Sequence, residues 1–166
     1  MAADGSFKAN FLSYFLATLI SAIPSLTGAA MAETATVGLP EVIDGETVRV
    51  AGQTFRLYGV DAPDIAQTCK IRGRTYNCGR VSMTALMDLV AGVRIRCVPR
   101  RDRATSPILA NCFATGYDLS EGMVHTGWAL AMPRGGTKYA GIEARAKIAK
   151  RGLWKGEFTL PWQWRR

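Results

Sequence analysis

The sequence is poor in the residues that build zinc sites. It has one histidine, His125, and none of its four cysteines is separated from another by only two residues. Because protein zinc sites normally combine closely spaced cysteines with histidines, the sequence disfavours one. It also contains no internal repeat and no low-complexity segment. At 166 residues the chain has room for a single globular domain.

Acidic residues are scarce relative to basic ones. The chain has 21 Lys and Arg against 13 Asp and Glu, which gives a net charge of +8. Such a balance attracts polyanions, including nucleic acid, anionic lipid and acidic polysaccharide. Charge alone does not choose among these partners, and it equally fits a protein whose surface is simply basic.

Charged residues are absent from the mostly apolar stretch 11–29, which follows a short polar start and precedes Ala30-Met31-Ala32. The small-x-small form of that tripeptide is typical of a signal-peptidase site. We therefore predict a signal peptide over residues 1–32 and a domain over 33–166. A retained membrane anchor is the alternative, disfavoured by Pro24 and Gly28 just before the site. The predicted product is periplasmic or secreted, with no stable membrane insertion.

Cysteine pairs are expected in an exported chain. The sequence places Cys69 and Cys78 in one predicted loop, and Cys97 and Cys112 on consecutive predicted strands. An even number of cysteines in an oxidising compartment favours two disulfides. Of the three possible connectivities, we favour 69 with 78 and 97 with 112.

Alternation of apolar residues predicts β-structure in the first half of the domain. Residues 47–50 and 53–60 form a predicted hairpin about Ala51-Gly52, with Val48, Val50, Phe55 and Leu57 facing inward. Arg56 then points to the opposite face. Three further strands are predicted over residues 35–43, 93–98 and 108–115.

Three helices are predicted, over residues 80–91, 119–126 and 139–151. The second has Asp118 as its N-cap and stops at Gly127, and the third has an apolar stripe of Tyr139, Ile142, Ala146 and Ala149. His125 is expected to be a partly buried helix residue rather than a catalyst. Five strands with these helices favour a small closed Greek-key barrel, an α+β fold that is mainly β.

Three of the carboxylates and one of the arginines in residues 42–64 form a candidate site. Glu46, Asp61 and Asp64 offer the hard oxygen ligands that Ca²⁺ or Mg²⁺ requires, and Arg56 offers a planar fork of donors for a phosphate. Each has a plainer interpretation, because carboxylates near turns are often caps and Arg56 can pair with Glu46 or Asp61. The four together favour a metal and phosphate site.

The order of the motifs resembles the staphylococcal nuclease (thermonuclease) family. The matching segments are VIDGETVRV, FRLYGVDAPD, GWALA, RGLW and the closing PWQWR. The chain is most similar to the compact, exported, disulfide-containing bacterial members. The resemblance implies a five-stranded OB-fold barrel with three helices, and Ca²⁺-dependent cleavage of DNA or RNA by a monomer.

The resemblance also implies a role for each site residue. Glu46 and Asp61 would bind the metal with the backbone carbonyl of Ala62, Arg56 would clamp the phosphate, and Asp64 would stand in the place of the general base. Chemistry of this kind needs a metal, cations for the phosphate charge and a base for water.

The family pattern is incomplete in this chain. Glu46 replaces an aspartate in the string DGDT, and Asp64 replaces a longer glutamate. The string D-x-Y-G-R is missing from residues 102–107, so its arginine has no direct equivalent, although Arg100, Arg101 and Arg103 are close in sequence. Tyrosines that usually flank the nucleotide are absent from residues 129–133. We therefore predict weakened cleavage, with a catalytically silent domain that binds nucleic acid or acidic exopolysaccharide as the alternative.

Overall fold

The computed structural model describes residues 34–100, 106–133 and 138–166. The predicted signal peptide and its cleavage site lie outside these residues. Within the described part of the chain, no helix has the length and apolar character needed to cross a bilayer.

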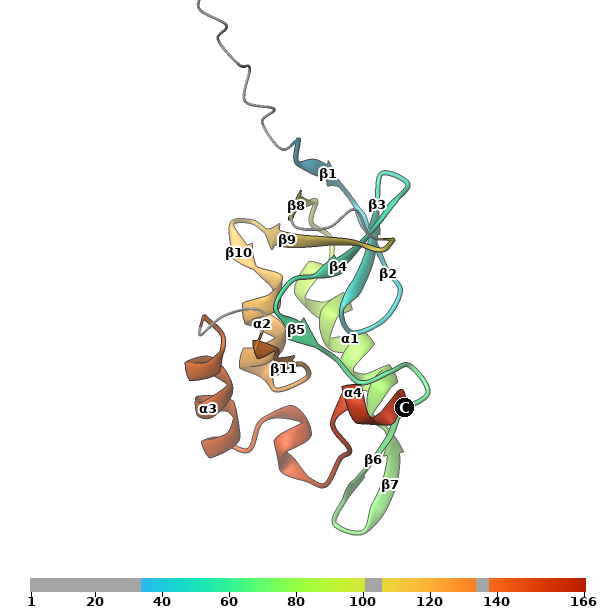
Figure 1. Cartoon of the computed structure of the whole chain (residues 1–166), viewed down its shortest axis with the longest axis vertical. Helices are drawn as coiled ribbons and strands as arrows, with labels where there is room; N and C mark the ends of the chain where they lie inside the picture. The colour runs from blue at the N-terminus through green and yellow to red at the C-terminus, as the bar shows by residue number, and fades with distance from the viewer. Residues whose placement is uncertain (1–33, 101–105, 134–137) are drawn as a thin grey trace, which may run out of the picture. The chain divides into compact units, whose positions relative to one another are not determined.

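The fold is a nearly closed β-barrel with helices packed around it (Figure 1). The barrel sheet runs in the order β1-β8-β9-β4-β3-β2, with β10 paired to β9; β4 and β9 are parallel and the other neighbours antiparallel. Its strands are β1 (Thr36–Gly38), β2 (Pro40–Val42), β3 (Thr47–Val50), β4 (Gln53–Leu57), β8 (Ile95–Pro99), β9 (Ile108–Ala114) and β10 (Tyr117–Asp118). The mainly β, OB-type fold is confirmed.

Barrel closure depends on the first two strands. β1 and β2 lie at opposite ends of the strand order, yet only Leu39 separates them in sequence. Two edges joined by one residue must lie close together, so the sheet curls toward closure. We predicted a single strand over residues 35–43; the chain instead bends at Leu39, just before Pro40, whose nitrogen has no hydrogen to donate to a ladder.

The predicted hairpin is present, and its apolar residues form the centre of the core. Val48, Val50, Phe55 and Leu57 are all fully buried, as alternation predicts. Helices α1 (Cys78–Val90) and α2 (Leu119–Thr126) add Leu86, Leu119, Met123 and Val124 to this core. The expected strand over 53–60 ends at Leu57, and the chain resumes extended structure as β5 (Val60–Asp61), which pairs with β11 (Leu130–Ala131).

The helix boundaries agree with the prediction for α2, whereas α1 starts at Cys78, two residues before the predicted Arg80. Asp118 Oδ1 accepts hydrogen bonds from the backbone nitrogens of Ser120 and Glu121, and α2 stops at Gly127 in a left-handed conformation. The third helix, α3 (Ala140–Ile148), is shorter than predicted because Lys150 adopts a positive φ of 47°. Ala149 is therefore exposed, whereas Tyr139, Ile142 and Ala146 are buried as expected.

Both predicted disulfides are present. Cys97 and Cys112 are directly opposite in the β8–β9 ladder, and Cys69 is bonded to Cys78 at the start of α1. The segment around Cys69 is not the predicted loop but a second hairpin of β6 (Thr68–Ile71) and β7 (Arg74–Asn77). Its turn places Arg72 and Gly73 at positive φ values of 50° and 73°.

A second, smaller core connects this hairpin to the end of the chain. Around the Cys69–Cys78 disulfide, buried Leu130 and Leu153 pack with half-buried aromatic and aliphatic residues. These partners are Tyr76, Trp128, Trp154, Phe158, Leu160 and Trp162. Figure 1 shows the last two elements, the 3₁₀ turn at Gly152–Lys155 and α4 (Pro161–Trp164), leading the chain back toward the β6–β7 hairpin.

Candidate active site

Glu46 is fixed in the turn that leads into β3. Its backbone nitrogen donates to Asp44 Oδ1 at 2.8 Å, and its carbonyl oxygen accepts from the nitrogen of Leu57 at 2.8 Å. Its side chain also accepts a hydrogen bond, from the nitrogen of Ala62 to Oε2 at 3.3 Å. Held at three points, the Glu46 carboxyl is buried and directed at the next two segments of the site.

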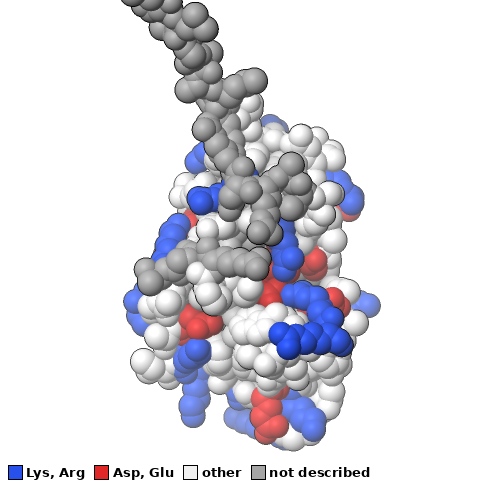
Figure 2. Space-filling model, in the orientation of Figure 1, with Lys and Arg blue, Asp and Glu red and all other residues white. Residues whose placement is uncertain are grey.

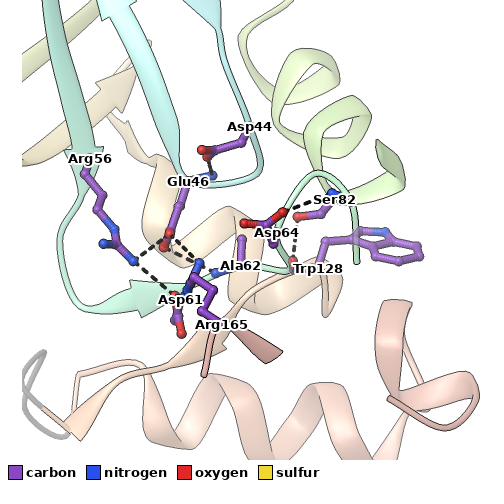
Figure 3. Close-up of polar contacts among 10 residues, drawn as sticks. Asp44, Glu46, Arg56, Asp61, Ala62, Asp64, Ser82, Trp128 and Arg165 are labelled. Carbon is purple, nitrogen blue, oxygen red and sulfur yellow. Dashed lines mark hydrogen bonds and ion pairs between the residues drawn. The ribbon is translucent and has the colours of Figure 1, made fainter. Parts of the chain in front are cut away.

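Arg56 and Asp61 converge on Glu46 from neighbouring strands. In β4, Arg56 lies opposite Thr47, which places it beside Glu46 and on the face away from Phe55 and Leu57. Asp61 ends β5, where pairing with Leu130 holds the backbone. The predicted association of Glu46, Arg56 and Asp61 is therefore seen in three dimensions (Figure 3).

The contacts within this cluster are short ion pairs. Arg56 Nη2 lies 2.6 Å from Glu46 Oε1 and 3.1 Å from Asp61 Oδ1. The carboxylate side chains are 6% and 2% exposed, whereas the Arg56 side chain is 39% exposed. The acidic groups thus form the floor of the site, and the guanidinium lies between them and solvent.

A second arginine, which we did not predict, joins the cluster from the end of the chain. Arg165 Nη2 donates to Asp61 Oδ1, and Arg165 Nη1 lies 3.7 Å from Glu46 Oε1 (Figure 3). The Arg165 side chain is 35% exposed. No spacing rule connects positions 104 residues apart. The only signal in the sequence is that PWQWR places an arginine just after two tryptophans.

Burial dominates the electrostatics of Glu46. Removal from water raises its pKa to about 7, although the positive charge of Arg56 acts to lower it; nearby Asp61 raises it further. For Arg165, burial acts to lower the pKa, but the hydrogen bond and charge of Asp61 outweigh it and the pKa is raised. The Glu46 carboxylate is therefore costly to keep ionised without cations beside it.

Asp64 lies near the cluster but is turned into a local hydrogen bond. Its Oδ1 accepts from the nitrogen of Ala66 at 3.0 Å, and its carbonyl oxygen accepts from the nitrogen of Gln67. The turn packs closely on α1, where a Cβ added to Gly79 would lie 1.8 Å from the Asp64 carbonyl oxygen. Within the described residues, no hydrogen bond or ion pair joins Asp64 to Arg56 or Glu46.

The donor set suits a hard divalent cation in part. Glu46 Oε1 and Asp61 Oδ1 already converge on one cationic nitrogen of Arg56, so two carboxylate oxygens face a common point. Among the described residues, no group of three His, Cys, Asp or Glu side chains is close enough to hold a metal. The pair therefore fits a Ca²⁺ or Mg²⁺ ion whose remaining ligands are backbone, water or phosphate oxygens.

Arg100, Arg101 and Arg103 are the arginines close in sequence to the missing D-x-Y-G-R string. Arg100 stands over the ring of Tyr58, with its guanidinium carbon 4.3 Å from the ring centroid. Arg101 and Arg103 lie outside the described residues. Within the described chain, the second guanidinium at the carboxylate pair is that of Arg165.

His125 differs from expectation in one respect. It is exposed rather than partly buried, because it lies at the C-terminal end of α2 on the side away from the core. Its Nε2 is 3.1 Å from Arg151 Nη1. The contact belongs to the helix surface and not to the carboxylate cluster.

Two comparisons show which known proteins this chain is similar to. A family model described as Staphylococcal nuclease homologue matches residues 54–156. The chain is also 32% identical over 158 residues to the succinoglycan biosynthesis protein ExoI of Rhizobium meliloti (strain 1021). That alignment covers 92% of this chain and 80% of the relative.

Proposed function

Because the chain belongs to the staphylococcal nuclease homologue family, we propose that it hydrolyses phosphodiester bonds of DNA or RNA with the help of Ca²⁺. One observation carries the proposal: two buried carboxylates, Glu46 and Asp61, lie under the partly exposed guanidinium of Arg56. A polyanion that reaches this site meets a cation first and the carboxylates behind it.

Each residue has a role that its position supports. Arg56 offers paired N–H donors to the non-bridging oxygens of a phosphate, where negative charge grows during cleavage. Glu46 and Asp61, with the carbonyl of Ala62, would hold the cation, which when bound supplies Lewis-acid stabilisation of the phosphate charge. Asp64 would accept a proton from the attacking water.

The position of Asp64 supports a slow reaction. Its carboxylate accepts a hydrogen bond from Ala66, so an oxygen that must face water is engaged in its own turn. Aspartate is also one methylene shorter than the glutamate typical of the family. A misplacement of about 1 Å costs on the order of 10²-fold in rate. We therefore propose cleavage well below that of a member with the complete pattern.

Cleavage of labelled single-stranded DNA and RNA tests the proposal. Protein purified after expression of the complete chain should cut either substrate with Ca²⁺ and stop on addition of chelator. Arg56→Gln should lose most of the activity. Arg49→Gln is the matched control, because Arg49 lies in the same hairpin and makes one exposed ion pair, with Glu41 at 2.7 Å. Absence of cleavage at high enzyme concentration would refute the proposal.

A second candidate function is binding of an anionic polymer without cleavage. The similar protein from Rhizobium meliloti is named for succinoglycan biosynthesis, and this chain has a net charge of +8. Figure 2 shows basic side chains spread over the visible face with acidic ones between them, rather than gathered in one strip. Salt-dependent retention on DNA and on an acidic polysaccharide, measured in chelator, tests this candidate.

The two disulfides suit an oxidising compartment. With the predicted signal peptide, they support a periplasmic or secreted protein. That it acts as a monomer is a separate proposal. Fractionation of cells that express the complete chain tests the location, and light scattering of the purified protein tests the monomer.

A further inference from the structure

We propose that Arg165, supplied by the C-terminal segment, is the second phosphate-binding arginine of the site. The inference rests on the proposed function, because it deepens the role of the same site. It assigns a guanidinium to the role of the D-x-Y-G-R arginine, a string that residues 102–107 do not contain.

The first argument is that both guanidiniums share the same two oxygens. Arg56 and Arg165 each contact Glu46 Oε1 and Asp61 Oδ1. The two guanidiniums therefore lie next to the same two carboxylate oxygens. A phosphate has several negative oxygens, so two convergent guanidiniums suit it better than one.

The second argument is the order of the layers. The side chains of Arg56 and Arg165 are 39% and 35% exposed, and those of Glu46 and Asp61 are 6% and 2% exposed. A ligand that arrives from solvent therefore meets two guanidiniums before any carboxylate. Each guanidinium has five N–H donors, and its contacts with the two carboxylates use at most two of them. Donors thus remain for an anion.

The third argument is that the segment carrying Arg165 is anchored. Backbone hydrogen bonds join Lys70 and Glu157 in both directions, at 2.9 Å and 2.8 Å. Gln67 Nε2 donates to the carbonyl oxygen of Thr159 at 2.7 Å. Arg165 is therefore presented by a fixed element, which reduces the conformational freedom that a guanidinium loses on binding.

Packing strengthens this anchor. Leu160 and Trp162 pack on the second core around the Cys69–Cys78 disulfide, and buried Pro161 starts α4. The β6–β7 hairpin and its disulfide thus contribute to the site. They hold the closing segment, residues 157–165, in the position where Arg165 reaches Asp61.

A purely structural role of Arg165 predicts a different result. If Arg165 only neutralises buried carboxylates, its loss weakens folding but leaves DNA binding and cleavage per folded molecule unchanged. If it blocks the site, its loss increases cleavage. If Arg165 binds phosphate, its loss lowers both DNA binding and cleavage.

The test compares Arg165→Gln with Arg165→Lys and with Arg166→Gln. Arg166 is the neighbouring exposed arginine and lies outside the cluster. Binding of fluorescein-labelled single-stranded DNA is measured in chelator at several salt concentrations, and kcat and KM for cleavage are measured with Ca²⁺. Circular dichroism and a urea titration give the folded fraction used to normalise each value.

Arg165→Gln should lower the slope of log K against log salt by about 0.7, the contribution of one phosphate contact to single-stranded DNA. It should lower kcat by about 10³-fold, the usual cost of losing a cation that serves the transition state. Arg165→Lys should restore part of the slope, because it keeps the charge without the planar fork. Arg166→Gln should resemble wild type.

Two outcomes separate the inference from the proposed function. If wild type cleaves and depends on Arg56, but Arg165→Gln matches Arg166→Gln in slope and kcat, the inference is wrong and the function stands. If wild type does not cleave, the function is wrong, and the loss of binding slope in Arg165→Gln alone still supports the inference. Faster cleavage by Arg165→Gln would overturn it.

Discussion

The substitution Gly156→Ala tests whether the closing segment positions Arg165 in the site. Gly156 itself does not contact the site. Gly156 follows the 3₁₀ turn and immediately precedes the backbone bridge between Lys70 and Glu157. A Cβ added there would lie 2.0 Å from the Lys70 carbonyl oxygen. Because that oxygen is backbone, no side-chain rotation relieves the clash, and the two segments must separate by roughly 1 Å or more.

The structure sets the size of the effect. Separation breaks two backbone hydrogen bonds, of 2.9 Å and 2.8 Å, between Lys70 and Glu157. At about 0.5 to 1.5 kcal/mol each, the free energy of unfolding should fall by about 1 to 3 kcal/mol. Displacing Arg165 by about 1 Å should lower kcat on the order of 10²-fold, although Gly156 lies outside the cluster.

The assay combines urea unfolding with cleavage of labelled single-stranded DNA in Ca²⁺. Gly141→Ala is the matched control, since a Cβ at this exposed position in α3 has its closest neighbour at 3.8 Å, on the Arg145 side chain. It should leave cleavage unchanged and stability equal or slightly higher, because alanine favours helix over glycine.

A double-mutant cycle that combines Gly156→Ala with Arg165→Gln shows why the cleavage rate falls in Gly156→Ala. If Gly156→Ala acts by moving Arg165, it should add little to the loss already caused by Arg165→Gln. Independent, fully additive losses would refute the reasoning, as would a Gly156→Ala protein that loses stability and keeps its cleavage rate.

Three further predictions concern other parts of the fold. Replacing Cys97 and Cys112 together by alanine should lower the free energy of unfolding by about 3 kcal/mol, because the bond closes a loop of 15 residues, and should leave cleavage per folded molecule intact; an equal loss of cleavage would contradict this. In chelator, stability should fall as pH rises from about 4.5 through 7, by up to roughly 3 kcal/mol. The reason is that the folded pKa of Glu46, about 7, exceeds its ordinary 4.5, so the folded protein holds the proton more tightly; urea titrations of Glu46→Gln should lack this fall, and an identical fall would assign it elsewhere. Asp64→Glu should increase kcat by about tenfold or more, by extending the carboxylate past its hydrogen bond with Ala66, whereas Asp64→Asn should lower it; equal rates for all three would exclude Asp64 as the base.

Much of the barrel and half of the site follow from local sequence. Alternation around residues 47–57 places Phe55 and Leu57 in the core and Arg56 on the other face, so the association of Arg56 with Glu46 needs only the hairpin register. The Cys97–Cys112 disulfide follows from strand adjacency, since the two residues are directly paired.

The missed elements lack a local signal. The β6–β7 strands contain few alternating apolar residues, and their turn needs positive φ at Arg72, an arginine with no intrinsic preference for it. This hairpin is stabilised by the Cys69–Cys78 bond and by the closing segment, which are tertiary contacts. Arg165 was missed for the same reason: its place depends on packing between segments far apart in the chain.

Cleavage of single-stranded DNA by wild type, Arg56→Gln, Arg165→Gln and the double variant tests the central claim most directly. With Ca²⁺, wild type should cut, each single variant should lose on the order of 10³-fold, and the double variant should lose less than the product of the two, because both arginines serve one phosphate. No cleavage by wild type at high enzyme concentration, or cleavage that is indifferent to both arginines, would contradict it.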